Sequence, residues 1–264
     1  MHRRWHKCLI VLGLFLLACG GETAVVPTPI SLQPAPTPTI PQIFETPTPI
    51  PTPKTVSFCD NQIAEPLTIL SLGDSYTIGE NIAEKDRYPN QLRDALQLRG
   101  IAVTDPIIIA RTGWTTADLL TAVDEASISE KFDIVTLLIG VNNQYRGLDL
   151  EQYEIEFKEL LTYAISQSKL GAERVFVLSI PDWGATPFAH RRNREQIGLE
   201  IDSYNTIKQR LTLEAGSRYI NITPLSRQAL QQASFTSSDF LHPSGYQYGF
   251  WVEEFLTVLC QIQT

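Results

Sequence analysis

The segment Asp239-Phe240-Leu241-His242 places a carboxylate three residues before an imidazole. On a turn, this separation can bring the carboxylate against the Nδ1–H of the histidine, which fixes the tautomer and stabilises the imidazolium. Of the other histidines, His2 and His6 lie in an N-terminal segment that is typical of an export signal. His190 lies among basic residues with no acid before it. His242 is therefore the candidate general base, with Asp239 as the group that orients it.

A serine follows an aliphatic run in Gly73-Asp74-Ser75, where a strand is expected to pass into a helix. A serine on a tight strand-to-helix turn projects its hydroxyl into solvent at the edge of a sheet. The glycine before it gives the backbone room to turn. The alternative is a serine that only caps a helix. With a base available elsewhere in the chain, Ser75 is the candidate nucleophile.

Two further polar segments, 111–114 and 140–143, each follow an aliphatic run. Gly113 can bring its backbone N–H close to a reacting group, and the side chain of Asn142 can donate a hydrogen bond into the same crevice. Together with the N–H of Ser75, these donors could converge on one developing oxyanion. Taken individually, Gly113 is also typical of a turn and Asn142 of a helix cap.

These residues need a scaffold that brings them together, and the rest of the chain predicts one. Aliphatic runs alternate with amphipathic stretches, which predicts a parallel sheet with helices on both faces. Five strands suit the flavodoxin-like order 2-1-3-4-5, in which ligands bind beyond the carboxyl ends of the strands where the order reverses. Ser75, Gly113 and Asn142 follow the first three strands, as this rule requires, whereas Asp239 and His242 lie after the last one. The expected strands are Leu67–Leu72, Pro106–Ala110, Ile134–Ile139, Arg174–Ile180 and Tyr219–Ile222.

Apolar stripes with helical spacing lie between these runs, and a last helix is expected after Pro243. Gly100 suits a C-cap for the first of them. Such stripes are ordinary core-facing surfaces and indicate no function. They comprise Leu92, Ala95 and Leu96; Phe157, Leu160, Leu161, Ala164 and Ile165; Ile197, Ile201, Tyr204, Ile207 and Leu211; and, in the last helix, Tyr246, Phe250 and Leu259.

Four polar blocks follow one another along nearly the whole domain and resemble, in the same order, the conserved blocks of the SGNH (GDSL-type) hydrolases: Gly73-Asp74-Ser75, Gly113, Gly140-x-Asn142 and Asp239-x-x-His242. The resemblance implies an α/β fold, a three-layer α/β/α flavodoxin-like sandwich with a five-stranded parallel sheet. It also implies ester hydrolysis through an acyl-serine, with no cofactor. The scarcity of histidines argues against a His-rich metal site, so no metal is expected. Carried over by position, Ser75 is the nucleophile, His242 the base and Asp239 its orienting acid. Ser75, Gly113 and Asn142 supply the oxyanion donors.

One position departs from the pattern of this family. Its third block commonly ends in aspartate, whereas Asn143 follows Asn142 here. The departure puts the detailed hydrogen bonding in question, and not the reaction. The α/β-hydrolase elbow, Gly-x-Ser-x-Gly, matches less well because Thr77 occupies its last position. A catalytically silent surface-binding module and an acyltransferase with the same triad are the alternatives to a hydrolase.

The N-terminal segment predicts export. A positively charged start precedes the apolar run Leu9–Leu17, which is too short to span a bilayer and is typical of a cleaved signal. The sequence Leu16-Leu17-Ala18-Cys19-Gly20 resembles a bacterial lipobox, in which Cys19 is acylated. We therefore expect a signal peptide over 1–18 and a lipoprotein on the outer face of a bacterial membrane. The alternative is an ordinary secretory signal and a secreted protein.

A proline- and threonine-rich stretch comes next, including Thr-Pro-Thr-Pro repeats. Proline fixes φ and donates no N–H, so the stretch should form a semi-rigid polyproline II spacer. We expect a lipidated linker over 19–57 and a hydrolase domain, predicted to be monomeric, over 58–264. The net charge of −8 and the lack of a basic run argue against nucleic acid as a partner.

The substrate and the remaining cysteines are less defined. A small-molecule, lipid or glycan ester is the expected substrate class, and fold and triad do not choose among them. Aromatic residues after strand ends either line the pocket or pack in the core. Cys59 and Cys260 remain after Cys8 and Cys19 are assigned, and in an exported protein they are expected to form a disulfide. The alternative is two buried free thiols. The aromatic residues are Trp114, Tyr145, Trp183 and Phe188.

Overall fold

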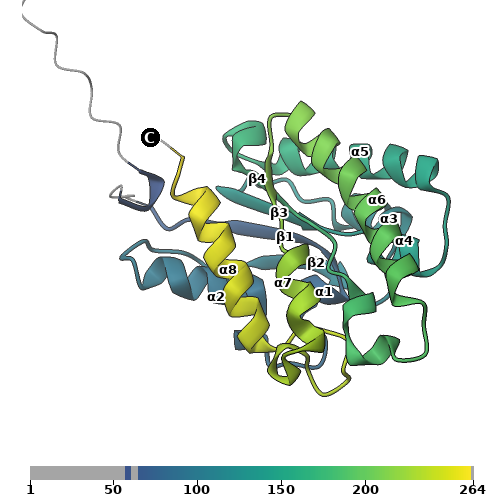
Figure 1. Ribbon diagram of the computed structural model, residues 1–264. Coiled ribbons are helices and arrows are strands. Elements are labelled where there is room, and N and C mark those ends of the chain that lie inside the picture. Colours follow the sequence, from purple (N-terminus) through teal and green to yellow (C-terminus); the bar gives the residue numbers. More distant parts are fainter. Residues whose placement is uncertain (1–56, 61–64, 263–264) are drawn as a thin grey trace, which may run out of the picture. The chain divides into compact units, whose positions relative to one another are not determined.

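The computed structural model describes residues 57–60 and 65–262, which belong almost entirely to the predicted hydrolase domain (Figure 1). The predicted signal peptide (1–18), the predicted lipidation site Cys19 and all but the last residue of the predicted linker (19–57) lie outside these ranges.

Five parallel strands form one sheet in the order β2-β1-β3-β4-β5, which confirms the predicted topology. The three inner strands β1, β3 and β4 are buried along their whole length, as expected of a parallel sheet that is covered on both faces. β1 continues to Asp74, two residues beyond the predicted strand, and delivers the chain directly to Ser75. The strands are β1 (Ile69–Asp74), β2 (Ile107–Arg111), β3 (Ile134–Leu138), β4 (Val175–Leu178) and β5 (Arg218–Ile220).

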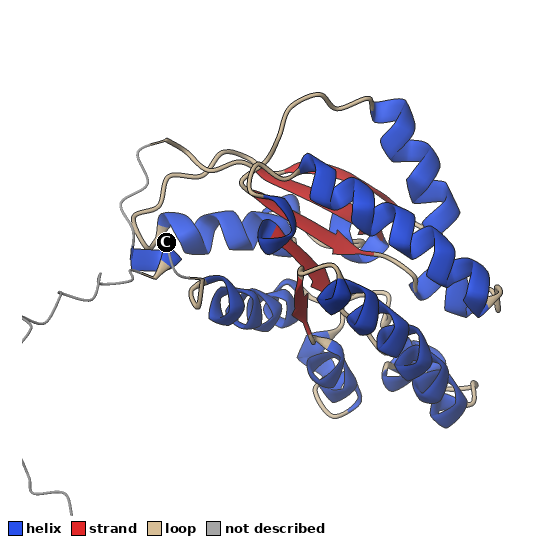
Figure 2. Cartoon of the chain, turned by 90° about the horizontal axis from the view of Figure 1, so that it is seen from above, coloured by secondary structure: helices blue, strands red, loops and turns tan. Residues whose placement is uncertain are grey.

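Helices cover both faces of the sheet, so the three-layer α/β/α architecture is also confirmed (Figures 1 and 2). α2 and α8 lie side by side on one face, and α3 packs on α5, which packs on α6, on the other. The α-helices are α1 (Ser75–Ile78), α2 (Tyr88–Gln97), α3 (Thr116–Ala126), α4 (Val141–Tyr145), α5 (Leu150–Gln167), α6 (Arg194–Glu214), α7 (Thr223–Ser226) and α8 (Gly245–Leu259).

Two details of the helices differ from the prediction. Gly100 is not the C-cap of α2, because the helix ends at Gln97 and is capped by Leu98. Gly100 instead belongs to the next turn, with φ of 80° and its N–H bonded to the carbonyl of Gln97. The second detail is α3, a helix for which the sequence analysis identified no apolar stripe. It begins at a capping box formed by Thr115 and Asp118.

The buried stripe of α6 contains a lysine. Ile207, predicted to face the core, is only half-buried, whereas Lys208 is fully buried. Its Nζ donates hydrogen bonds of 2.9 Å to the carbonyls of Ile139 and Leu178, at the carboxyl ends of β3 and β4. Burial lowers the pKa of Lys208 to about 7. The lysine therefore ties α6 to the sheet edge that carries the polar segments.

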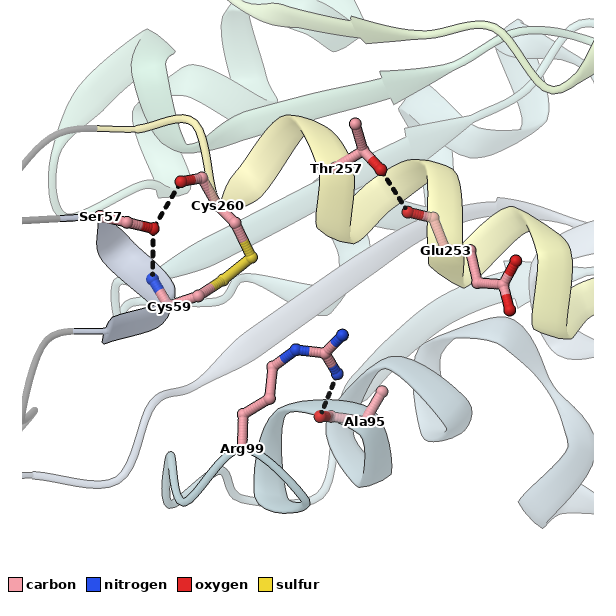
Figure 3. The surroundings of a disulfide bond; sticks show 7 residues. All are labelled: Ser57, Cys59, Ala95, Arg99, Glu253, Thr257 and Cys260. Carbon is pink, nitrogen blue, oxygen red and sulfur yellow. Dashed lines mark hydrogen bonds between the residues drawn. A yellow bond between two sulfur atoms is a disulfide. The ribbon is translucent and has the colours of Figure 1, made fainter.

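A disulfide bond joins Cys59 and Cys260, the two cysteines that the sequence analysis paired (Figure 3). Ser57 reinforces the junction, since its hydroxyl donates to the carbonyl of Cys260 at 2.5 Å and accepts from the N–H of Cys59 at 3.3 Å. The bond fastens the short 3-10 turn Phe58–Asp60 to the end of α8, 201 residues later in the chain.

We expect the replacement of both cysteines by serine, Cys59→Ser with Cys260→Ser, to lower the free energy of unfolding by about 5 kcal/mol, because the bond closes so long a loop in the unfolded chain. Denaturant titration of oxidised, reduced and double-variant protein measures the effect. The oxidised and double-variant proteins should hydrolyse an ester at the same rate, because neither cysteine lines the pocket that contains Ser75. Equal midpoints for all three proteins would contradict the expectation.

Candidate active site

Ser75 opens α1 at the end of β1, on a turn that only a glycine at position 73 permits. A Cβ on Gly73 would lie 2.1 Å from Oγ1 of Thr77 and 2.4 Å from the carbonyl oxygen of Leu138. Asp74 caps the helix, its Oδ1 accepting the N–H of Tyr76 at 3.0 Å. Burial raises the pKa of Asp74 to about 7. Gly73 and Asp74 thus shape the turn that places Ser75 at the end of β1.

His242 lies between the serine and the acid. Its Nε2 is 3.0 Å from Oγ of Ser75, and its Nδ1 is 2.6 Å from Oδ2 of Asp239. The intervening Phe240 has φ of 62°, in the left-handed region, and is exposed. This turn lets Oδ1 of Asp239 accept the backbone N–H groups of Leu241 and His242 at 2.8 and 2.9 Å. The structure therefore brings the three predicted triad residues into one continuous chain of hydrogen bonds.

Asp239 is held in its ionised form. Partial burial by itself raises the pKa of this carboxyl, but the hydrogen bonds from His242, from the backbone and from Ser237 lower it well below its usual range. Asn81, which comes after α1, adds a bond from Nδ2 to Oδ2 of Asp239 at 2.5 Å. A fixed carboxylate on Nδ1 holds the imidazole in the tautomer whose Nε2 can accept a proton from Ser75.

A pocket of about 230 Å³ opens above the triad and contains every predicted oxyanion donor. Three of the four aromatic residues considered from the sequence line it, whereas Trp114 packs against the core instead. The remaining lining is largely apolar. The pocket is lined by Ser75, Tyr76, Thr112, Gly113, Val141, Asn142, Tyr145, Trp183, Phe188, Leu241 and His242.

Side chains at α4 hold the loop that carries Gly113. Nδ2 of Asn142 donates to the carbonyl of Trp114 at 2.9 Å, and the guanidinium of Arg146 donates to the carbonyl of Gly113 at 2.5 Å. Gly113 itself has φ of 84°, a conformation that glycine adopts without strain. An amide nitrogen carries two hydrogens, so the bond to Trp114 fixes the group and leaves one N–H of Asn142 for the pocket.

Removal of this amide in Asn142→Ala is expected to lower kcat about 100- to 1,000-fold with little change in KM, because the bond is strongest to the oxyanion of the transition state. The matched control is Arg146→Ala, which removes the other bond to the loop but keeps the amide. Its kcat should fall less than about tenfold, as expected for one exposed contact. Steady-state kinetics on a p-nitrophenyl ester measure both. A change confined to KM in Asn142→Ala would assign the residue to substrate binding instead.

Asn143, the residue that departs from the family pattern, has a defined role in this structure. Its side chain is buried, accepts the N–H of Thr116 at 3.1 Å and donates to Oγ1 of Thr116 at 2.6 Å. That hydroxyl in turn donates to Glu156 on α5. An aspartate at position 143 would compete with Glu156 for the single hydrogen of the Thr116 hydroxyl. Because Glu156 already accepts that hydrogen, position 143 needs a donor to Oγ1 of Thr116, and the amide of Asn143 supplies it.

We therefore expect Asn143→Asp to lower the free energy of unfolding by about 3 kcal/mol, because one buried carboxylate loses its donor. Adding Glu156→Gln supplies an amide donor to Oγ1 of Thr116, which can then donate to the new aspartate. The double variant should recover at least half of the loss. Chemical denaturation of the two single variants and the double variant measures the coupling. Additive losses would show that Glu156 does not determine the residue at 143.

Within residues 57–60 and 65–262, no cluster of three or more histidine, cysteine, aspartate or glutamate side chains could hold a metal ion. The same described ranges contain no helix long and apolar enough to cross a membrane. His190, set aside as a surface residue from its sequence context, is exposed.

The model of the GDSL-like Lipase/Acylhydrolase family matches residues 71–249 of the chain. The match spans more than half of the sequence and contains Ser75, Gly113, Asn142 and His242. The chain belongs to this family and is a carboxylic ester hydrolase of the GDSL type. A comparison with curated protein sequences found no match.

Solved structures share the fold at low sequence identity. LAE5, an alpha/beta hydrolase enzyme from the metagenome of Lake Arreo, Spain, is 19% identical with a TM-score of 0.57, over 75% of this chain and 96% of its own. TesA is 17% identical with a TM-score of 0.58, over 73% and 97%. Axe2, an acetylxylan esterase from Geobacillus stearothermophilus, is 18% identical with a TM-score of 0.59, over 73% and 94%. At these identities the likeness shows the fold alone.

Proposed function

We propose that this protein cleaves carboxylic esters by a Ser-His-Asp mechanism through an acyl-serine intermediate. The observation that carries the proposal is the unbroken hydrogen-bonded chain Asp239–His242–Ser75, of which Ser75 and His242 line a pocket. No metal or cofactor is needed for this chemistry, because the base and the oxyanion donors come from the chain itself.

In the acylation step, Nε2 of His242 takes the proton of Ser75 as Oγ attacks the ester carbonyl. The carbonyl oxygen becomes an oxyanion that the N–H of Ser75, the N–H of Gly113 and the side chain of Asn142 stabilise. Asp239 stabilises the imidazolium that forms meanwhile. The imidazolium then protonates the alcohol oxygen as the bond to the acyl carbon breaks, and the alcohol leaves.

In the deacylation step, water takes the place of the alcohol. His242 accepts a proton from the water, which attacks the acyl carbon on Ser75 and forms a second oxyanion at the same donors. Collapse of this intermediate breaks the bond to Oγ, and His242 returns the proton to Ser75. The net reaction converts one ester and one water into an acid and an alcohol.

The pocket favours a short acyl group, because it is small and its lining, including Val141, Trp183 and Phe188, is mostly apolar. The acetylxylan esterase Axe2 among the fold neighbours is consistent with this choice. A series of p-nitrophenyl esters from acetate through butyrate and octanoate to palmitate tests it. kcat/KM should be highest for the shorter esters and fall steeply at the longer ones.

Product analysis separates a hydrolase from a transferase. With a competing alcohol present, a hydrolase releases free acid from the acyl-enzyme, and the acid should account for most of the product. Ester transferred to the added alcohol as the main product would instead identify an acyltransferase. Absence of any turnover with all esters would support a binding module that keeps the fold without the activity.

We further propose that the protein is exported and anchored through an acylated Cys19 on the outer face of a bacterial membrane. The support is the charged and apolar start, the lipobox-like segment and the proline-rich linker. Labelling of cells with an alkyne fatty acid should mark the wild type and not a Cys19→Ser variant, which should leave the membrane fraction. Equal labelling of both would contradict the anchor, and an unlabelled, released wild type would indicate a secreted protein.

A further inference from the structure

We infer that a second cavity beside the catalytic pocket binds the alcohol part of the ester, and that this part is a polyhydroxylated group such as a sugar ring. The inference rests on the proposed function and adds the substrate class to it. The cavity has a volume of about 500 Å³. Tyr145 and Trp183 line both spaces, so the two adjoin at these aromatic side chains. The acyl group at Ser75 then occupies the apolar pocket, and the alcohol extends past the aromatic pair.

The residues that line the catalytic pocket and those that line the second cavity differ in chemistry. The catalytic pocket is mainly apolar, whereas side chains with planar hydrogen-bonding groups dominate the second cavity. Such groups donate and accept in fixed directions and suit a ligand with many hydroxyls, each of which both donates and accepts. An acyl tail in the cavity would cover the guanidinium of Arg192 without giving it a hydrogen-bond partner, at a free-energy cost. The side chains with planar hydrogen-bonding groups are Gln144, Arg146, Arg192, Asn193, Gln196 and Glu200.

One wall of the cavity is already ordered by its own hydrogen bonds. The indole N–H of Trp183 donates to Oε1 of Gln144 at 2.7 Å, and Nε2 of Gln144 donates to one oxygen of Glu200 at 2.6 Å. The other oxygen accepts from Nε2 of Gln196 at 2.7 Å. This relay joins α4 to the first turns of α6. It fixes the polar wall in relation to Trp183, which also lines the catalytic pocket, so ligand binding requires little further ordering.

The charged side chains of the cavity and the exposed ring of Tyr145 narrow the ligand class further. The lining carries the guanidinium groups of Arg146 and Arg192 and the carboxylate of Glu200, a formal net charge of +1, and both oxygens of that carboxylate already accept from Gln144 and Gln196. In the described part of the chain, the guanidinium of Arg192 has no hydrogen-bond partner, which leaves its donors for a ligand. Tyr145 is 48% exposed as a residue, and its ring can receive the apolar C–H face of a sugar. A sugar ring suits both groups, because its hydroxyls can accept from the guanidinium of Arg192 while its C–H face packs on the ring of Tyr145.

Three esters with the same acetyl group test the inference: an O-acetylated methyl glucoside, the anionic acetyl ester of glycerol phosphate, and p-nitrophenyl acetate as reference. The variants are Arg192→Ala and Gln196→Ala, with Arg191→Ala as the control, since Arg191 is exposed and does not line the cavity. For each protein, kcat/KM for the glucoside is divided by kcat/KM for p-nitrophenyl acetate. We expect each cavity variant to lower this quotient about tenfold, mainly because KM for the glucoside rises. This change corresponds to about 1.4 kcal/mol. The control should keep the wild-type quotient.

A quotient unchanged in both cavity variants, with p-nitrophenyl acetate still cleaved, would overturn the sugar subsite and leave the proposed function standing. A selective loss on the phosphate ester would overturn it as well, because the site would then bind an anion. If the wild type cleaves none of the three esters, the proposed function itself fails.

Discussion

The Ser75→Ala variant is expected to lose hydrolysis of a short p-nitrophenyl ester almost completely, with kcat lower by about 10⁶-fold. In the proposed mechanism Oγ of Ser75 forms the bond to the acyl group, and no other hydroxyl in the pocket lies on Nε2 of His242. Alanine fits the buried turn without a clash, so the fold should persist. Circular dichroism and the unfolding midpoint verify that it does.

His242→Ala should lose activity to a similar extent, and the double variant should be no worse than either single one, because the members of a catalytic unit fail together. The matched control is His190→Ala, which removes the other histidine of the described domain from an exposed position and should keep wild-type kcat. Near-normal turnover by Ser75→Ala would show that the mechanism is wrong.

The second large effect is expected for Asp239→Asn, with kcat lower by about 10⁴-fold and the fold intact. The new amide can still accept the backbone N–H groups of Leu241 and His242 through its oxygen. Its nitrogen would then face Nδ1, where two donors cannot pair. The imidazole is expected to switch to the tautomer with its hydrogen on Nε2, which cannot accept the proton of Ser75.

The matched control for this variant is Asn81→Ala, which removes a bond to Oδ2 of Asp239 and keeps the carboxylate. Its kcat should fall less than about tenfold, because the bonds from the backbone and from His242 still hold the acid. Stopped-flow or steady-state assays at neutral pH measure both. A loss in Asn81→Ala as large as in Asp239→Asn would mean that placement of the acid, and not its charge, limits the rate.

Local patterns predicted the strands and the polar blocks at their ends. Each block is a short segment after a strand. A parallel sheet brings the carboxyl ends of its strands to one edge, and this does not depend on how the helices pack. The strand order then placed Ser75, Gly113 and Asn142 at one edge. The pairing of Cys59 with Cys260 came from elimination, since few cysteines remained.

Contacts between distant elements could not be predicted in the same way. Lys208 occupies a core position of α6 because two strand-end carbonyls need a donor there, and those carbonyls meet the helix only in the folded chain. The only sign of it in the sequence is a lysine spaced seven residues after Ile201 and three before Leu211 in an apolar stripe. Asn81 reaches Asp239 across 158 residues, and no spacing rule connects them.

Active-site labelling with an organophosphonate, combined with mass spectrometry of the peptides, decides whether Ser75 is the nucleophile. We expect one adduct per chain, on Ser75, with activity lost in proportion to labelling. Ser75→Ala should remain unlabelled, and His242→Ala should label far more slowly. A stoichiometric adduct on another residue, with Ser75 unmodified and hydrolysis abolished, would contradict the assignment of Ser75 as the nucleophile.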